Sequence, residues 1–180
     1  EKTLRDNPRA SFVDAKVCSL RTDGSSITGA VDSNGVIHTG DAYYLAPGAS
    51  FSEIVGASQL PVKFPRIFFG IGCGVLLKTS SLTLEKCLRT PNRGLACGVY
   101  CAPRNGDHSF VGASNLISPE PSEHARSTSV LSLVEAAIDQ VNRDFYRAEF
   151  VAVKVGWRPT SEDTMPLLGR AMENLVVATG

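Results

Sequence analysis

The sequence predicts a mixed α+β fold built mainly from antiparallel strands. Two turn signals, Asn34-Gly35 and Asn105-Gly106-Asp107, separate short apolar segments and are typical of β-hairpins. Residues 127–145 instead carry apolar side chains at three- and four-residue spacing, which predicts a helix. The chain has 180 residues, enough to bury a core as one large domain or as parts of two.

Composition and charge argue against several classes of function. The 18 basic and 18 acidic side chains cancel, so no surplus charge favours nucleic acid or an anionic membrane. Apolar runs such as residues 67–77 are broken by glycines and are too short to span a bilayer, and no secretory leader opens the sequence. Five cysteines without a compact framework favour reduced thiols and a cytoplasmic protein. Three scattered histidines and the lack of a Cys-x-x-Cys pair predict no metal site.

The first 49 residues predict a β-meander. Residues 11–21 are expected to form a strand, residues 27–32 its return and residues 36–39 a third strand. Asn34 and Gly35 both suit a positive φ, so we expect a tight hairpin turn there. Residues 42–46 predict a short buried strand that ends at Pro47-Gly48.

The central residues predict a second, mostly antiparallel region. Residues 72–78 are rich in β-formers, and residues 82–89 predict a further strand, with a helical turn over 84–88 as the alternative. Residues 97–104 and 109–113 are expected to pair as a hairpin.

The predicted helix over residues 127–145 has one apolar face and should pack against a core. Ser127 or Ser129 is the expected N-cap, while Glu135 and Arg143 suit the helix dipole. Its apolar face is formed by Val130, Leu133, Val134, Ala137, Ile138 and Val141.

The last segment begins with a predicted strand over residues 150–155 that leads to Trp157 and Arg158 and stops at Pro159. Pro159 holds its own φ and favours an extended Arg158, so the guanidinium leaves a fixed backbone. Such an arginine suits a carboxylate bound by paired hydrogen bonds; the alternative is a surface arginine before a turn. A polar turn, an apolar run closed by Gly169 and a strand over residues 174–180 follow.

These motifs occur together in one known family. Gly156-Trp157-Arg158-Pro159, followed by Pro166-Leu167-Leu168-Gly169, resembles the Gly-x-Arg-Pro…Pro-x-x-Gly segment of FAD-dependent amine and amino-acid oxidases of the D-amino-acid oxidase and glycine oxidase type. Ala178-Thr179-Gly180 is similar to that family's flavin-contacting Ala-Thr-Gly. Tyr100-Cys101-Ala102-Pro103 resembles its Tyr-x-x-Pro strand, and the meander leading to Ala46-Pro47-Gly48 resembles the second half of its flavin-binding domain.

The resemblance implies an α/β, Rossmann-like flavin-binding portion beside an antiparallel substrate-binding sheet with one helix. Residues 1–49 would be the second half of the FAD-binding domain, residues 50–150 the substrate-binding domain, and residues 151–180 the return to the FAD domain. By the same resemblance Arg158 would bind a substrate carboxylate and Tyr100 would donate a hydrogen bond to it. For Tyr100 the alternative is a ring packed on the core with its hydroxyl at the rim.

The resemblance also implies the residues beside the cofactor, namely Val17, Ala46, Pro47, Gly48 and Gly180. Pro47 stands where the family usually has threonine or serine and lacks an N–H donor. Related sarcosine oxidases attach flavin through a cysteine in this last segment. No cysteine lies between residues 151 and 180, so the expected FAD is noncovalent.

No Gly-x-Gly-x-x-Gly turn opening a helix is present, because Gly70-x-Gly72-x-Gly74 lies in an apolar strand-like run. We therefore expect a subunit or cleaved fragment that needs a second polypeptide with the Gly-rich half, and an amino acid or amine as substrate. The sequence contains no Ser-His-Asp, Cys-His or paired-carboxylate pattern for acid–base catalysis. The resemblance implies that the flavin carries the hydride chemistry. The alternatives are a non-catalytic binding or assembly subunit and an independent β-rich domain.

Overall fold

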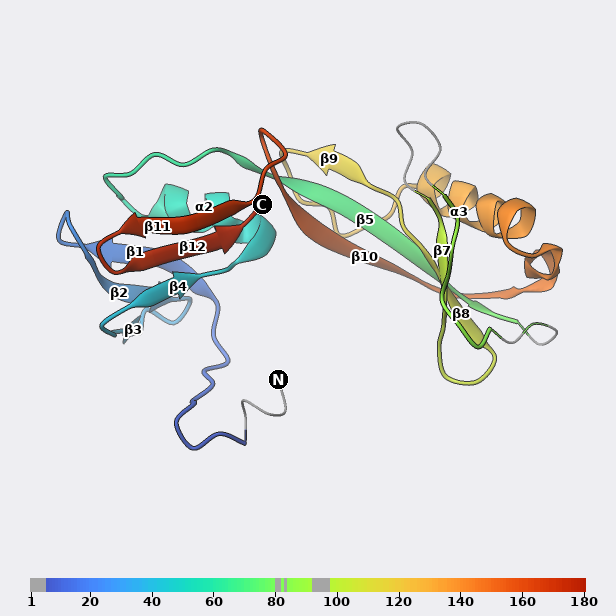
Figure 1. Ribbon diagram of the computed structural model, residues 1–180, viewed down its shortest axis with the longest axis horizontal. Helices are drawn as coiled ribbons and strands as arrows, with labels where there is room; N and C mark the ends of the chain where they lie inside the picture. Colours follow the sequence, from blue (N-terminus) through green and yellow to red (C-terminus); the bar gives the residue numbers. More distant parts are fainter. Residues whose placement is uncertain (1–5, 80–81, 83, 92–97) are drawn as a thin grey trace. The chain divides into compact units, whose positions relative to one another are not determined.

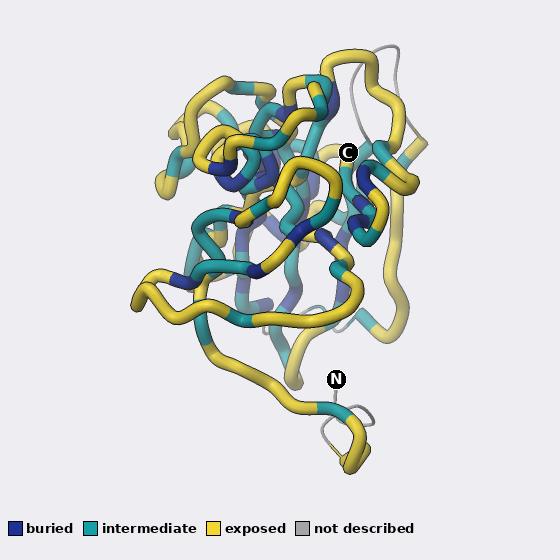
Figure 2. Tube along the Cα trace, turned by 90° about the vertical axis from the view of Figure 1, so that its left-hand side faces the viewer, coloured by how far each residue is buried: buried dark blue, intermediate teal, exposed yellow. Residues whose placement is uncertain are grey.

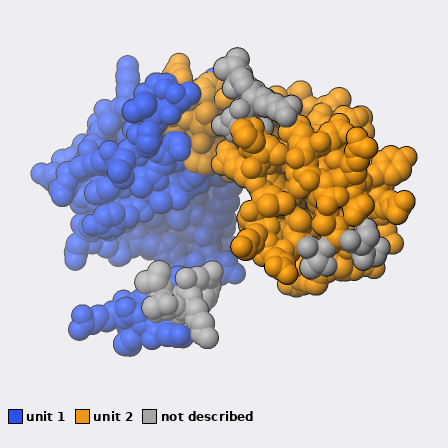
Figure 3. Space-filling model, turned by 45° about the vertical axis from the view of Figure 1, so that its right-hand side comes forward, with its two compact units in different colours: residues 1–66, 163–180 blue, residues 67–162 orange. Residues whose placement is uncertain are grey.

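The computed structural model describes residues 6–79, 82, 84–91 and 98–180. The chain divides into two compact units (Figure 3): residues 1–66 with 163–180 form unit 1, and residues 67–162 form unit 2. The predicted divisions fall at other positions, since residues 50–66 lie in unit 1 and residues 151–162 in unit 2. The functional assignment of the three predicted segments stays a prediction.

Unit 1 holds two small sheets (Figure 1). The first is an antiparallel meander of β1 (Val17–Thr22), β2 (Ile27–Asp32) and β3 (Ile37–His38), in that order. The second has the order β11 (Leu167–Met172), β12 (Leu175–Thr179) and β4 (Tyr43–Leu45), and β4 runs parallel to β12. A 3-10 turn, η1 (Gly48–Ser50), continues into the short helix α2 (Phe51–Ala57).

A buried carboxylate holds the turn between β2 and β3. Asp32 is 5% exposed. Its Oδ1 accepts hydrogen bonds from the backbone N–H groups of Asn34 (2.8 Å) and Val36 (3.0 Å), and its Oδ2 lies 2.9 Å from Nε2 of His38. The hydrogen bond with His38, followed by the two backbone donors, lowers the pKa of Asp32 against the opposing effect of burial.

The lowered pKa of Asp32 predicts a loss of stability in acid. A carboxyl whose folded pKa lies below its ordinary value of 3.8 contributes stability above that pH, and the contribution is lost as the pH falls through the folded pKa. We expect Asp32→Asn to reduce the drop in melting temperature between about pH 6 and pH 3. Asp139→Asn, at an exposed aspartate of unit 2, is the control, and its melting temperature should depend on pH as that of wild type does. An unchanged acid dependence in Asp32→Asn would contradict this role.

Unit 2 is an antiparallel sheet covered on one face by a helix. Its strand order is β10 (Glu149–Ser161), β5 (Ile67–Lys78), β8 (His108–Gly112), β7 (Tyr100–Pro103) and β6 (Leu88–Arg89), with β9 (Leu116–Ser118) also paired to β5. The helix is α3 (Ser127–Gln140), and the 3-10 segment η2 (Arg143–Arg147) follows it.

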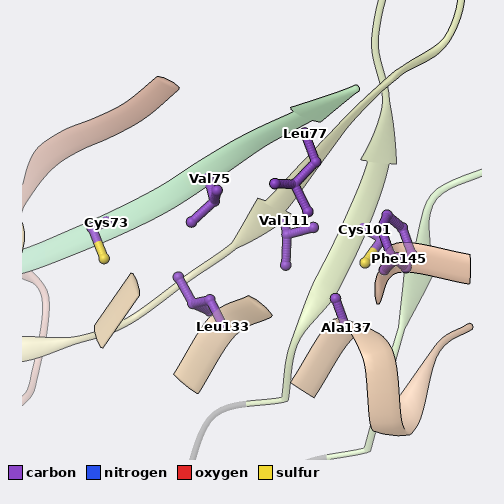
Figure 4. Packing of buried hydrophobic residues seen from close by; sticks show 8 residues of the cluster. All are labelled: Cys73, Val75, Leu77, Cys101, Val111, Leu133, Ala137 and Phe145. Carbon is purple, nitrogen blue, oxygen red and sulfur yellow. The ribbon is translucent and has the colours of Figure 1, made fainter. Parts of the chain in front are cut away.

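The core of unit 2 lies between α3 and one face of the sheet (Figure 4). Alternate residues of β5 face the helix, because side chains of a strand point to opposite sides in turn. The buried cluster consists of Cys73, Val75, Leu77, Cys101, Val111, Leu133, Ala137 and Phe145.

Burial raises the pKa of the Cys101 thiol to about 11, so this thiol stays protonated near neutral pH. Cys18, Cys73, Cys87 and Cys101 are free thiols, and Cys97 lies outside the described residues.

The structure confirms the predicted mixed α+β fold, including the meander and the antiparallel sheet of unit 2. β2 occupies the predicted residues, and β7 and β8 form the predicted hairpin within the part of it that is described. The glycines at 70, 72 and 74 lie within β5, as expected for a close-packed strand. Over the described residues, none of the helices has the length and hydropathy needed to cross a bilayer.

The strand predicted over residues 11–21 was wrong at its start. β1 begins at Val17, and the tube before it is mostly exposed (Figure 2). β2 has six residues and pairs with residues 17–22, so the earlier residues have no strand beside them. The turn also differs from the expectation, because Gly35 has a φ of 79° while Asn34 does not take a positive φ.

The predicted strand over residues 82–89 is also wrong for most of its length. Only Leu88 and Arg89 are in a strand; residues 82 and 84–87 are neither strand nor helix, and residue 83 lies outside the described residues. The side chains of Leu82 and Leu84 instead pack against the core, although their backbone is irregular.

The predicted long helix ends early, and its predicted caps are wrong. α3 stops at Gln140, and a separate 3-10 segment carries Phe145. The N-cap is Arg126, without a side-chain cap bond, while Ser127 and Ser129 lie inside the helix. The short helix α2 was not predicted, although Ser50-x-x-Glu53 is a capping-box pattern that could have indicated it.

Pro159 does not end its strand, contrary to expectation. β10 continues to Ser161, and Pro159 is paired in register with Phe69. β10 lies at the edge of the described sheet, where a residue without an N–H is tolerated. The backbone of Arg158 is therefore held by a neighbouring strand as well as by the proline.

Candidate functional site

The face of the unit 2 sheet opposite α3 has a floor of glycines. On β5 the residues facing away from the core include Gly70, Gly72 and Gly74. The register places Gly156 of β10 opposite Gly72, and Gly112 of β8 opposite Gly74. Adjacent strands therefore present bare backbone on this face, which leaves room for other side chains to lie flat on it.

The side chains of Arg158, Tyr100 and Phe110 lie over these glycines. A Cβ at position 72 would lie 2.5 Å from Nη1 of Arg158, and a Cβ at 112 would lie 2.7 Å from the hydroxyl oxygen of Tyr100. A Cβ at position 74 would overlap the ring of Phe110. The glycines are thus required for the guanidinium and the two rings to take their places.

These side chains border one cavity of about 300 Å³. All of its lining residues belong to unit 2. Its lining consists of Gly72, Cys73, Gly74, Tyr100, Phe110, Ala113, Lys154, Val155, Gly156, Trp157 and Arg158.

The guanidinium of Arg158 makes one hydrogen bond to the protein and has further N–H donors. Its Nη1 donates to the carbonyl oxygen of Ser114 at 3.2 Å. Ser114 is itself fixed to β5, because its Oγ accepts from the backbone N–H of Cys73 at 3.0 Å and its own N–H donates to the Cys73 carbonyl at 3.1 Å. Within the described residues no carboxylate pairs with Arg158, so most of its five N–H donors remain for a ligand.

Tyr100 approaches the same cavity from β7. Its ring centroid lies 6.1 Å from that of Phe110, and its hydroxyl lies over Gly112. The structure thus brings Arg158 and Tyr100 together, as the resemblance implies. Their roles toward a substrate stay predictions.

Trp157 and Asn115 differ in their relation to this cavity. The indole of Trp157 packs edge-on against Phe69, with centroids 5.7 Å apart, and its Nε1 donates to the carbonyl of Ser122 at 2.8 Å. Trp157 lines the cavity while its ring is held by these two contacts. Asn115 does not line the cavity; its Oδ1 lies beside Gly70.

Two features of this site, the glycine floor and Lys154, were not predicted from the sequence. Lys154 lies four residues before Arg158 on β10, and a strand places both on one face. The period-2 pattern counted back from Arg158 was the signal that could have found it.

A separate group of residues lies in unit 1, where the carboxyl ends of β4 and β12 meet because the two strands are parallel. Thr179 Oγ1 donates to the carbonyl of Gly48 at 3.1 Å, which joins the segment after β4 to the end of β12. Gly48 has a φ of 61° and Gly180 a φ of 113°, conformations that favour glycine. Ala46, Pro47, Gly48 and Gly180 are therefore gathered at one edge.

Val17 lies in the other sheet of unit 1. It is the first residue of β1, and its neighbour Lys16 lies 3.0 Å from the carboxylate of Glu53 in α2. The predicted cofactor residues thus share unit 1, although contact with a cofactor stays a prediction. Among the described residues no three His, Cys, Asp or Glu side chains are grouped as metal ligands would be.

The glycine floor gives a test that leaves every polar group in place. We expect Gly72→Ala to displace the guanidinium of Arg158, because the new methyl would lie against Nη1. Carboxylate binding should weaken about tenfold, because the displaced guanidinium would no longer direct two parallel N–H donors at the carboxylate. Gly56→Ala, where a Cβ meets no atom within 4 Å, is the matched control. Equal ligand affinity in both variants would contradict the placement of Arg158.

Comparison with known proteins shows that residues 7–180 match the family model described as FAD dependent oxidoreductase (DAO). Glycine oxidase from Bacillus cereus ATCC 14579 shares the fold with a TM-score of 0.72 and 20% identity, over 94% of this chain and 44% of that one. Glycine oxidase from Geobacillus kaustophilus gives a TM-score of 0.72 and 24% identity, over 92% and 42%. Iminodiacetate oxidase from Chelativorans sp. BNC1 gives 0.73 and 19%, over 93% and 44%.

The chain thus spans less than half the length of these solved structures. No curated protein matches the sequence.

Proposed function

The chain belongs to the FAD-dependent oxidoreductase family, and on that premise we propose that it is a subunit or cleaved fragment of an enzyme that oxidises an amino acid or related amine carrying a carboxylate. The observation that carries the proposal is the guanidinium of Arg158. It lies on a glycine floor in a cavity of about 300 Å³, unpaired with any described carboxylate and facing the same space as Tyr100.

Arg158 would bind the substrate carboxylate through two parallel N–H···O bonds, for which its planar guanidinium is suited. The hydroxyl of Tyr100 would donate to the same carboxylate, and the ring of Phe110 would limit where the rest of the substrate lies. Together they orient the amine-bearing carbon. Protein groups in this chain thus bind and position, and we assign none of them as acid or base.

The residues of unit 1 fit part of an FAD site. The edge where β4 and β12 end is formed by small residues and backbone, as a dinucleotide requires for close approach. Ala46, Gly48 and Gly180 would lie against the cofactor through their backbone, with Val17 toward its adenine side. Pro47 contributes a carbonyl but no N–H donor. When bound, FAD supplies the acceptor for the hydride that leaves the substrate carbon.

We propose that a second polypeptide carrying the Gly-rich dinucleotide-binding half completes this site. The support is the sequence, in which no Gly-x-Gly-x-x-Gly turn opens a helix. The FAD is proposed to be noncovalent, since residues 151–180 contain no cysteine. A cytoplasmic location is proposed as well, because an odd count of five cysteines without a compact framework favours reduced thiols.

The second candidate is a non-catalytic binding or assembly subunit that retains the oxidase scaffold. Pro47 favours it, because it removes one backbone donor at the place where the family's flavin contacts lie. Arg158 favours the enzyme, because its guanidinium borders the same cavity as Tyr100 on a floor of glycines.

Native mass spectrometry of the protein from its source, with an absorbance spectrum, tests the proposal. We expect a mass well above 19.2 kDa and flavin absorbance bands at about 370 and 450 nm. Amine and amino-acid substrates should then bleach the flavin band in the absence of oxygen. A colourless species of 19.2 kDa would contradict the enzyme and favour the assembly subunit.

A further inference from the structure

We propose that Lys154 binds a second anionic group of the substrate, so that the preferred substrate is an amine carrying two carboxylates. The inference rests on the proposed function and specifies its substrate class. It starts from the position of Lys154 on β10, four residues before Arg158 and on the same face of the sheet.

Lys154 stands where two cavities meet. One is the cavity of about 300 Å³ that contains Arg158 and Tyr100. The other, of about 410 Å³, is lined by Leu76, Arg104, Asn105, His108, Phe110 and Lys154. Lys154 and Phe110 line both, and the ring of Phe110 lies over Gly74, the register partner of Lys154.

The guanidinium of Arg158 extends toward Lys154. Arg158 pairs in register with Gly70, but its guanidinium lies over Gly72, one step closer to the Lys154–Gly74 pair. Alternate residues on one face of a strand are about 6.6 Å apart. That spacing suits one small molecule whose two carboxylates are separated by a few bonds.

The charge of Lys154 is not compensated by the protein. On the same face, Lys78 lies 3.9 Å from both Asp107 and Glu149. Within the described residues Lys154 has no such partner, and neither does Arg158. A monocarboxylate could pair with one of these cations, whereas a dicarboxylate could pair with both.

The second cavity has a further cation at its wall. The guanidinium carbon of Arg104 lies 5.5 Å from the ring centroid of Phe110, which holds this side chain beside the cavity. A substrate chain passing Phe110 would therefore remain in a positive environment. This favours an anionic side chain over an apolar one of the same length.

The test uses the FAD-loaded enzyme with Lys154→Met, which keeps the length of the stem and removes the charge, and Lys154→Arg, which retains the charge. Lys63→Met, on an exposed lysine of unit 1, is the matched control. Two ratios are measured: kcat/KM for aspartate over alanine, using whichever enantiomers are oxidised, and the Kd of propionate over that of succinate by calorimetry.

Wild type, Lys154→Arg and Lys63→Met should prefer the dicarboxylate in both ratios, and Lys154→Met should lose about tenfold of that preference. An equal preference in wild type and Lys154→Met, or no preference in wild type, would overturn the inference. If no amine is oxidised but the succinate preference is present and depends on Lys154, the proposed function fails while the second anion site stands.

Discussion

Arg158→Leu is expected to lower kcat/KM for a carboxylate-bearing amine about tenfold to a hundredfold. The loss follows because a charge-assisted hydrogen bond typically contributes ~1.5–3 kcal/mol, and leucine offers no donor to the carboxylate. The same variant should weaken binding of an unreactive carboxylate by a similar factor, since the interaction is made in the bound state. Steady-state kinetics and calorimetry check the two expectations.

Two comparisons separate the role of the guanidinium from general damage. Arg158→Lys keeps the charge but not the paired geometry, so we expect an intermediate loss. Arg143→Leu makes the same change on an exposed arginine of η2 that does not line the cavity, and should leave kcat/KM unchanged. An amine without a carboxylate should be oxidised equally by Arg158→Leu and wild type; a parallel loss on that substrate would show that Arg158 supports the fold rather than the carboxylate.

Phe145→Ala is expected to lower the free energy of unfolding by about 3–5 kcal/mol. Phe145 is 2% exposed and belongs to the cluster that joins α3 and η2 to the sheet. Removing its ring leaves a cavity that rigid strands and the helix cannot close, so both the transfer free energy and the packing contacts are lost. Urea denaturation of the protein, monitored by the fluorescence of Trp157, measures the change.

The adjacent residue provides the control for that measurement. Tyr146 lies in the same 3-10 segment but is 80% exposed, so Tyr146→Ala should change stability by no more than about 0.5 kcal/mol. Equal losses from the two variants would contradict the assignment of Phe145 to the core, because the two changes alter local backbone propensity alike.

Local patterns predicted the elements whose signals are complete within a few residues. The meander over β1, β2 and β3 follows from alternating apolar residues and from Asp23-Gly24 and Asn34-Gly35 turns. The amphipathic stripe of α3 predicted which face packs on the core, and Leu133 and Ala137 are buried there. The pairing of β7 with β8 follows from the Asn105-Gly106-Asp107 turn in the same way.

Boundaries that depend on a distant partner could not be read from such patterns. β1 begins only where β2 can pair with it, and β10 passes through Pro159 because β5 is twelve residues long and lies beside it. The end of α3 at Gln140 is likewise set by packing, since Phe145 reaches the core from a separate turn. Propensity alone does not contain this information.

By itself the sequence determined that the protein has a mixed α+β fold, because strand alternation and turn chemistry are local. The resemblance of its motifs to one family made Arg158 and Tyr100 candidates for one site. Only the tertiary structure decided that both line one cavity and that Lys154 stands beside them. It also decided that glycines of β5 and β8 form the floor beneath their side chains. The reason is register: which residues become neighbours across strands depends on the pairing of segments that are tens of residues apart.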